Sequence, residues 1–130
     1  MLAVALLATG CFGDSSAGAP RVSMHEVAGA LKAVGLPQLS TRTGAFDQTN
    51  VAPKSLRAAE LGQVSGFCDG DQLFQVDIFR TSAAARLKLS QIPSVAETGH
   101  PFKAQVHKNL MILDTCRPAN AKAEAAVKTL

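Results

Sequence analysis

Residues 68–80 read CDGDQLFQVDIFR, and this stretch decides the fold of the chain. The Asp-Gly pair at 69–70 lies between two extended segments, which is a strong short-range signal for a β-hairpin. After the pair, Phe74, Val76 and Ile78 alternate with polar residues, which predicts a strand with one buried face. The second half of the segment 58–67 is predicted to be the first strand of the hairpin.

The chain after this hairpin predicts a helix, a loop, a second hairpin and a final helix. The helix is expected at 83–89 and the loop at 91–101. The strands of the second hairpin are expected at 103–106 and 110–116, and the final helix from Pro118 onward. Thr81 or Ser82 suits the cap of the first helix. The run LMIL at 110–113 is apolar on both faces, which indicates a central strand. Pro118 suits the first turn of the final helix because its missing N–H has no partner there.

The chain before the hairpin carries the clearest local signal. Ser23 and Glu26 form a capping box, and Gly35 supplies a C-terminal stop, so we expect a helix over 24–34. A short strand is predicted within 39–46 and a turn at 50–53. Together these elements predict an α+β fold, with one antiparallel sheet of about four to five strands and about three helices packed on one face.

The first residues have the pattern of an export signal. Residues 2–8 read LAVALLA, which is far too short to span a bilayer but matches a signal-peptide apolar segment. Leu7-Ala8-Thr9-Gly10-Cys11 resembles the lipobox of bacterial lipoproteins. In that family the cysteine takes a diacylglycerol on its thiol and becomes the first mature residue. The resemblance implies that Cys11 is the lipid attachment site.

The resemblance also implies a location, namely lipid anchorage at the extracytoplasmic face of the cell membrane. Residues 12–20 read FGDSSAGAP, a composition typical of a flexible linker. We therefore expect a signal peptide at 1–10, the lipidated cysteine and tether at 11–20, and one domain at 21–130. Two alternatives stay open: cleavage after Ala19, or an apolar element at 1–10 that belongs to the fold.

The chain has three cysteines, and lipidation of Cys11 leaves two of them. An exported protein works in an oxidising compartment, so Cys68 and Cys116 are predicted to form a disulfide. Both residues end predicted strands, which places the bridge at the end of the sheet. A pair of buried free thiols is the alternative, and a redox-active pair would more often have the C-x-x-C spacing.

Composition limits the classes of function. The chain is 47% hydrophobic and 18% charged, which is ordinary for a globular domain. It has no Trp or Tyr, which weakens any prediction of sugar or base stacking. The net charge of +3 is spread along the chain without a basic run, so we expect no nucleic-acid binding.

No pattern of reactive side chains points to catalysis or to a cofactor. Asp69, Asp71 and Asp77 lack the spacing of a calcium loop and are better explained by the hairpin. The three histidines, His25, His100 and His107, have no zinc-ligand spacing, so no metal site is predicted. No nucleophile elbow or phosphate loop occurs.

The functional expectation follows from location and from this absence of motifs. We expect a membrane-anchored, non-enzymatic binding or accessory module of the bacterial cell envelope, whose partner is an envelope protein or a small-molecule ligand. The alternatives are a small envelope hydrolase, or a structural protein that self-associates through its edge strands.

Overall fold

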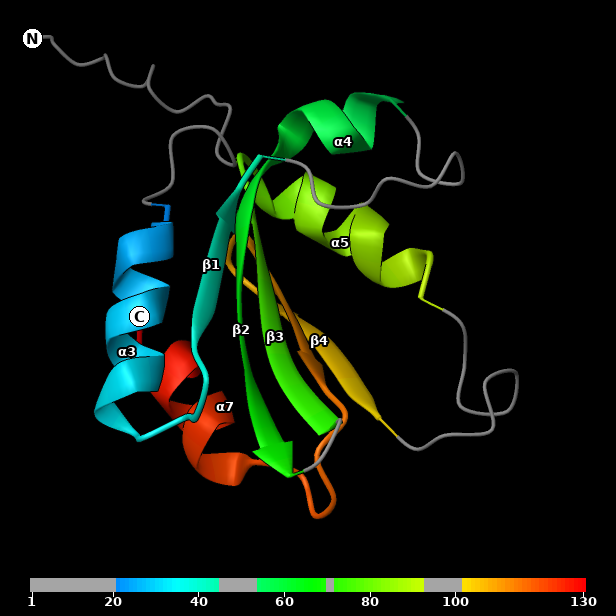
Figure 1. Cartoon of the computed structure of the whole chain (residues 1–130). Coiled ribbons are helices and arrows are strands. Elements are labelled where there is room, and N and C mark those ends of the chain that lie inside the picture. Colours follow the sequence, from blue (N-terminus) through cyan, green and yellow to red (C-terminus); the bar gives the residue numbers. More distant parts are fainter. Residues whose placement is uncertain (1–20, 45–53, 70–71, 93–101) are drawn as a thin grey trace, which may run out of the picture.

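The computed structural model describes residues 21–44, 54–69, 72–92 and 102–130. Its elements in chain order are α3 (Met24–Ala33), β1 (Ser40–Thr43), α4 (Lys54–Ala59), β2 (Glu60–Asp69), β3 (Gln72–Phe79), α5 (Ser82–Ser90), β4 (Lys103–His107), β5 (Leu110–Asp114) and α7 (Ala121–Lys128). The five strands form one antiparallel sheet in the order β1-β2-β3-β5-β4 (Figure 1). The α+β fold with an antiparallel sheet is therefore confirmed.

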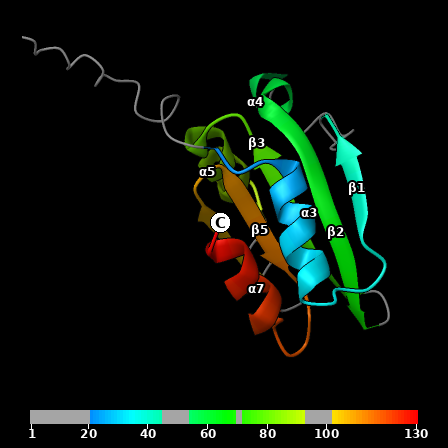
Figure 2. The same cartoon turned by 90° about the vertical axis from the view of Figure 1, so that its left-hand side faces the viewer.

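The helices lie on both faces of this sheet. Helices α3 and α7 contact each other on one face, and α5 packs against β3, β4 and β5 on the other (Figures 1 and 2). The expectation that all helices share one face therefore needs correction. Its basis was the alternation along β3, and that alternation is incomplete, because Asp77 and Phe79 are buried on the second face.

The core consists of two hydrophobic clusters, one on each face. The larger joins α3 and α7 to the inward residues Val64, Val76 and Ile112. The smaller joins α5 to Phe79 and Met111. The described residues of both clusters come from position 22 onward, and the expectation that the segment 21–130 folds on its own stays a prediction.

Several local predictions are confirmed by the hydrogen bonds that stabilise the elements. Ser23 and Glu26 form the capping box of α3, and the Thr81 hydroxyl accepts from the Ala84 N–H at the start of α5. Strand β5, which contains LMIL, lies between β3 and β4. The two predicted hairpins pair as expected, β2 with β3 and β4 with β5.

Other boundaries differ from the prediction. The final helix begins at Ala121 instead of near Pro118, because the Asn120 side chain accepts from the Ala123 N–H and serves as N-cap. Among the described residues, the predicted strand within 39–46 corresponds to β1, and the start of the segment 58–67 belongs to α4. The predicted turn at 50–53 and most of the loop at 91–101 lie outside the described residues.

One buried side chain fixes where the chain enters the domain. Asn109 is 3% exposed, and its Oδ1 accepts from the Val22 N–H at 2.8 Å. Its Nδ2 donates to the carbonyls of Val22 at 3.0 Å and of Phe79 at 2.8 Å. We call this end of the sheet, where Val22, Phe79 and Asn109 meet, the entry end. The opposite end of β5, with Asp114 and the segment 115–120, is the far end.

Candidate functional site

An open pocket of about 260 Å³ lies at the far end of the sheet. Strand β4 begins at one side of it, β5 ends at its base, and the turn that leads into α7 closes the other side. Its lining residues are Phe102, Lys103, Asp114, Cys116, Arg117, Pro118 and Ala119. Both basic side chains are exposed, so the pocket combines an apolar wall with two cations at its rim.

A disulfide between Cys68 and Cys116 holds this end together. The two Cα atoms are 5.8 Å apart, and the bridge ties the end of β2 to the turn that lines the pocket. The predicted pairing is confirmed. Asp114 also lies beside the two sulfurs, but both sulfurs are used in the disulfide and are not available as metal ligands.

Asp114 is the carboxyl group at the base of the pocket, and it is 1% exposed. Its Oδ1 accepts from the Cys116 N–H at 2.9 Å, and its Oδ2 accepts from the Asn120 N–H at 2.8 Å. Asp114 therefore shapes the turn between β5 and α7. Burial raises the pKa of Asp114 above its ordinary value of 3.8, and a hydrogen bond with Glu124 adds to this, against the lowering effect of the two backbone amides.

Glu124 of α7 is the partner of this carboxyl group. Its Oε1 accepts from Lys103 Nζ at 3.0 Å and from Gln105 Nε2 at 3.2 Å, whereas Oε2 is buried and no N–H group reaches it. Burial raises the pKa of Glu124, but the hydrogen bonds that it receives, first from Asp114 and then from Lys103, outweigh burial and hold the pKa below 4.5.

The pKa values of these two carboxyl groups shift in opposite directions, so as the pH falls Asp114 is expected to take up a proton before Glu124 does. The negative charge of Glu124 is balanced by Lys103, whose Nζ lies 3.0 Å from Oε1. Two adjacent carboxyl groups cannot both ionise without mutual repulsion. The pair therefore stabilises the base of the pocket and leaves Arg117 as a rim cation that forms no ion pair within the described residues.

A second polar cluster lies on the face of the sheet that carries α5. Asp77 is 1% exposed, and its Oδ1 accepts from Gln63 Nε2 at 3.0 Å and from Gln75 Nε2 at 3.1 Å. The strand register places Arg42, Gln63 and Asp77 in one row across β1, β2 and β3.

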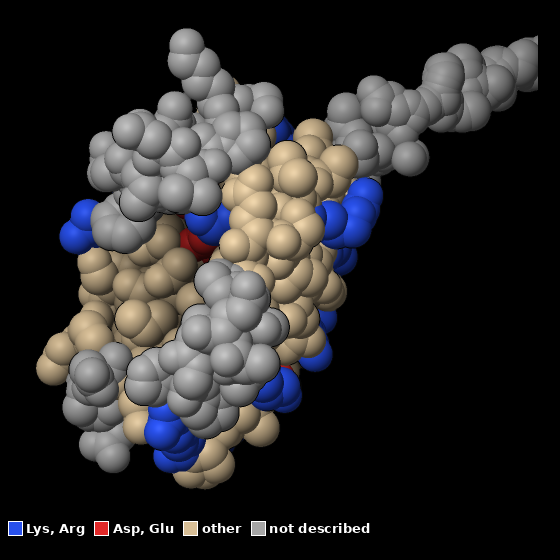
Figure 3. All heavy atoms as spheres, turned by 90° about the vertical axis from the view of Figure 1, so that its right-hand side faces the viewer, with Lys and Arg blue, Asp and Glu red and all other residues tan. Residues whose placement is uncertain are grey.

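The structure separates acidic from basic side chains in a way that composition does not reveal. Four of the five acidic side chains that the structure describes are buried, and Glu26 is the exposed one. Exposed basic side chains occur at ten described positions: Arg21, Lys32, Arg42, Arg80, Arg86, Lys103, Lys108, Arg117, Lys122 and Lys128. On the face shown in Figure 3, basic side chains are prominent and acidic atoms appear only in small recessed areas. The described surface is thus far more cationic than a net charge of +3 suggests.

The sequence-predicted residues do not come together at one site. His25 is exposed on α3, and His107 lies beside the carbonyl of Leu130 at 3.3 Å. Cys11, His100 and Asp71 lie outside the described residues, as does the side chain of Asp69. The prediction for Cys11 therefore stays a prediction. Among the described helices, none combines the length and the apolar character needed to cross a bilayer.

Sequence reasoning missed the residues that form the far-end pocket. Asp114 ends an apolar strand, and Glu124 lies among the alanines of α7 beside the buried Ala123. The sequence offers one signal of this pair, namely that Glu124 lies within the apolar face of a helix. It does not indicate Asp114 as the partner, because the two residues are ten positions apart and a turn lies between them. Comparison of the chain with protein-family models, with curated proteins and with solved structures finds no match.

Proposed function

We propose that this protein is a lipid-anchored module of the bacterial cell envelope that binds a small organic anion in the far-end pocket, without catalysis. The observation that carries the proposal is the exposed guanidinium of Arg117 at the rim of the pocket, with Phe102 as an apolar wall. Lys103 also lines the rim, but its charge is balanced by Glu124. Ligand sites typically combine apolar lining with a few polar groups that fix orientation. The lipobox-like segment that ends at Cys11 supplies the location.

A binding role fits the far end better than catalysis does. Both oxygens of Asp114 accept backbone N–H groups, and Glu124 does not line the pocket. A general acid or base needs a free position toward its substrate. Arg117, by contrast, is exposed, and a guanidinium binds a carboxylate or a phosphate through two parallel hydrogen bonds.

The proposed ligand class is testable with benzoate as the probe, because it joins one carboxylate to one ring. An NMR titration of the segment 21–130 should shift the backbone amides of Phe102, Arg117 and Ala119, and benzyl alcohol, which has the ring without the charge, should shift them less. Arg117→Gln should weaken benzoate binding by roughly 10- to 150-fold, since a hydrogen bond to a charged group contributes about 1.5–3 kcal/mol and each 1.4 kcal/mol is tenfold.

Lys122→Gln is the matched control, because Lys122 is exposed on α7 and does not line the pocket. It should leave the titration unchanged. Equal weakening by the two variants, or benzoate-induced shifts that avoid the pocket residues, would contradict the proposed site.

A further inference from the structure

The entry end carries a group of exposed basic side chains beside the point where the tether joins the domain. Arg21 is the first described residue, and its Nη1 donates to the carbonyl of Arg80 at 3.4 Å, so these two residues lie together. Lys108 lies in the turn before β5 and donates to the carbonyl of Leu130, which closely follows Lys128. We call Arg21, Arg80, Lys108 and Lys128 the entry-end cations.

Only part of this positive charge is balanced by acidic residues that the structure describes. Glu26, in the first turn of α3, is the one exposed acid, and it lies close enough to Lys108 for the lysine to help lower the pKa of Glu26. The hydrogen bond from the Ser23 N–H is the main cause of that lowered pKa. The other described acids are buried. Arg21, Arg80 and Lys128 thus form no ion pair within the described residues.

We propose that the entry-end cations dock the domain on the anionic lipid headgroups of its own membrane. This inference rests on the proposed location of the protein, and it adds an interaction surface that the lipid anchor alone does not supply. The partner is identified by charge complementarity and by position, because the tether joins the domain at the same end that carries the cations.

The length of the tether makes such docking feasible. The nine residues between Cys11 and Arg21 allow a separation of at most about 30–32 Å, which is the covalent limit for nine residues. Electrostatic attraction is screened over about 8 Å at physiological ionic strength, so the cations act only when the domain rests on the surface. A tether of this length gives an effective concentration in the millimolar range, so even a weak intrinsic affinity keeps the domain docked.

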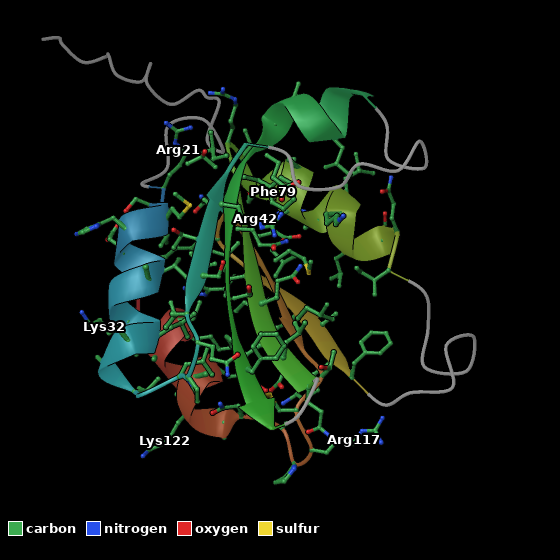
Figure 4. All side chains as sticks on the ribbon, viewed as in Figure 1. Arg21, Lys32, Arg42, Phe79, Arg117 and Lys122 are labelled. Atoms are coloured by element: carbon green, nitrogen blue, oxygen red, sulfur yellow. A yellow bond between two sulfur atoms is a disulfide. The ribbon has the colours of Figure 1, made fainter. Side chains whose placement is uncertain are left out.

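Docking through the entry end would also orient the far-end pocket. Strand β5 runs from Leu110, next to Asn109 at the entry end, to Asp114 at the far end. Figure 4 shows Arg21 and Arg117 at opposite ends of the molecule. The pocket then faces away from the bilayer, where a ligand from the surrounding compartment has access. A domain that swings freely on its tether would have no such preferred orientation.

The experiment is co-sedimentation with lipid vesicles of the segment 21–130, once circular dichroism has shown that this segment folds. The segment lacks the apolar residues at 2–8, so these residues do not contribute to the measured binding. One set of vesicles contains phosphatidylcholine alone, and the other contains phosphatidylcholine with phosphatidylglycerol. Binding is expected only with the anionic vesicles, and it should decrease as salt is added.

Two double variants then locate the surface. Arg21→Gln with Lys128→Gln should weaken binding by roughly 30-fold. Each lost cation reduces the free energy of binding by about 1 kcal/mol, and each 1.4 kcal/mol corresponds to a tenfold change in affinity. Lys32→Gln with Lys122→Gln removes the same charge near the opposite end, as Figure 4 shows for the two lysines, and should change binding much less.

Three results would overturn the docking proposal: equal losses for the two double variants, equal binding to neutral and anionic vesicles, or stronger binding to soluble polyphosphate than to anionic vesicles. None of these results depends on Cys11 or on the pocket. The benzoate titration and the fate of Cys11→Ser test the proposed function separately, so failure of one proposal is distinguishable from failure of the other.

Discussion

Removal of the Asn109 side chain should destabilise the domain more than removal of a helix N-cap does. Asn109→Ala leaves the Val22 N–H, the Val22 carbonyl and the Phe79 carbonyl without their shared partner. A buried polar group without a hydrogen bond costs about 1–3 kcal/mol. Because the three groups are coupled and water can reach some of them after truncation, we expect a total loss of about 3–5 kcal/mol.

Urea denaturation of the segment 21–130, followed by circular dichroism, measures this loss. Asn120→Ala is the matched control, because Asn120 caps α7 through one hydrogen bond to the Ala123 N–H. Loss of an N-cap costs about 1 kcal/mol. The comparison isolates the shared role of Asn109 from the general effect of an asparagine truncation.

A second variant separates hydrogen bonding from packing at the entry end. Asn109→Asp preserves the shape and the acceptor for the Val22 N–H, but at neutral pH it sets a buried carboxylate against two carbonyl oxygens. It should be at least as destabilising as the alanine variant at neutral pH and should recover in part when acid protonates it. A loss for Asn109→Ala no larger than that of Asn120→Ala would refute the reasoning.

Three further predictions concern the far end and the close packing of the sheet. Glu124→Gln keeps the shape of the side chain and an acceptor for Lys103 and Gln105, but it removes the carboxyl group that lies beside Asp114. The raised pKa of Asp114 favours folding below 3.8, and this contribution is lost as pH rises through the raised value. Burial of Asp114, the larger cause of the shift, remains in the variant, whereas the contribution of the Glu124 carboxyl group is removed. In urea titrations at several pH values the variant should therefore lose less stability over this range than the wild type does. Replacement of both disulfide cysteines by alanine removes a crosslink with a sequence separation of 48 and should lower the free energy of unfolding by about 4 kcal/mol, as measured against the wild type without reductant. Gly66→Ala would place a Cβ 2.6 Å from the Leu36 side chain and should destabilise the protein by about 1–3 kcal/mol. Gly29→Ala lies in a helix, its Cβ would meet nothing within 4 Å, and it should stabilise the protein by about 0.5–1 kcal/mol. Calorimetry that ranks the two variants in the opposite order would contradict the packing.

The elements that local signals control were predictable from sequence. The capping box of Ser23 and Glu26 involves groups three residues apart, and the alternation along β3 reflects the two-residue period of a strand. Both are properties of a short stretch of chain. The same holds for the placement of β5, because a strand that is apolar on both faces is favoured in the interior of a sheet, and β5 lies between β3 and β4.

The far-end pocket depends on groups that meet only after folding. Asp114 and Glu124 become a pair because β5 ends beside the inward face of α7, and nothing in the local sequence at either residue reports the other. Asp77 illustrates the same limit. It alternates with apolar residues and was expected on an open face, but α5 covers part of that face and the amides of Gln63 and Gln75 satisfy its carboxylate.

The disulfide was predictable for a different reason. It followed from the number of cysteines and from an assumed compartment, and only two thiols remained once Cys11 was assigned to lipid. The bridge between Cys68 and Cys116 agrees with that count. Cys11 itself lies outside the described residues, so its assignment still rests on the lipobox-like segment.

The proposed location is tested most directly by the intact mass of the full-length protein recovered from the membrane fraction of a bacterial host. The account predicts loss of residues 1–10, addition of a diacylglycerol with its acyl chains at Cys11, and release of the Cys11→Ser variant from the membrane fraction. A chain that keeps residues 1–10 with an unmodified Cys11, or a Cys11→Ser variant that stays in the membrane fraction as the wild type does, would contradict it.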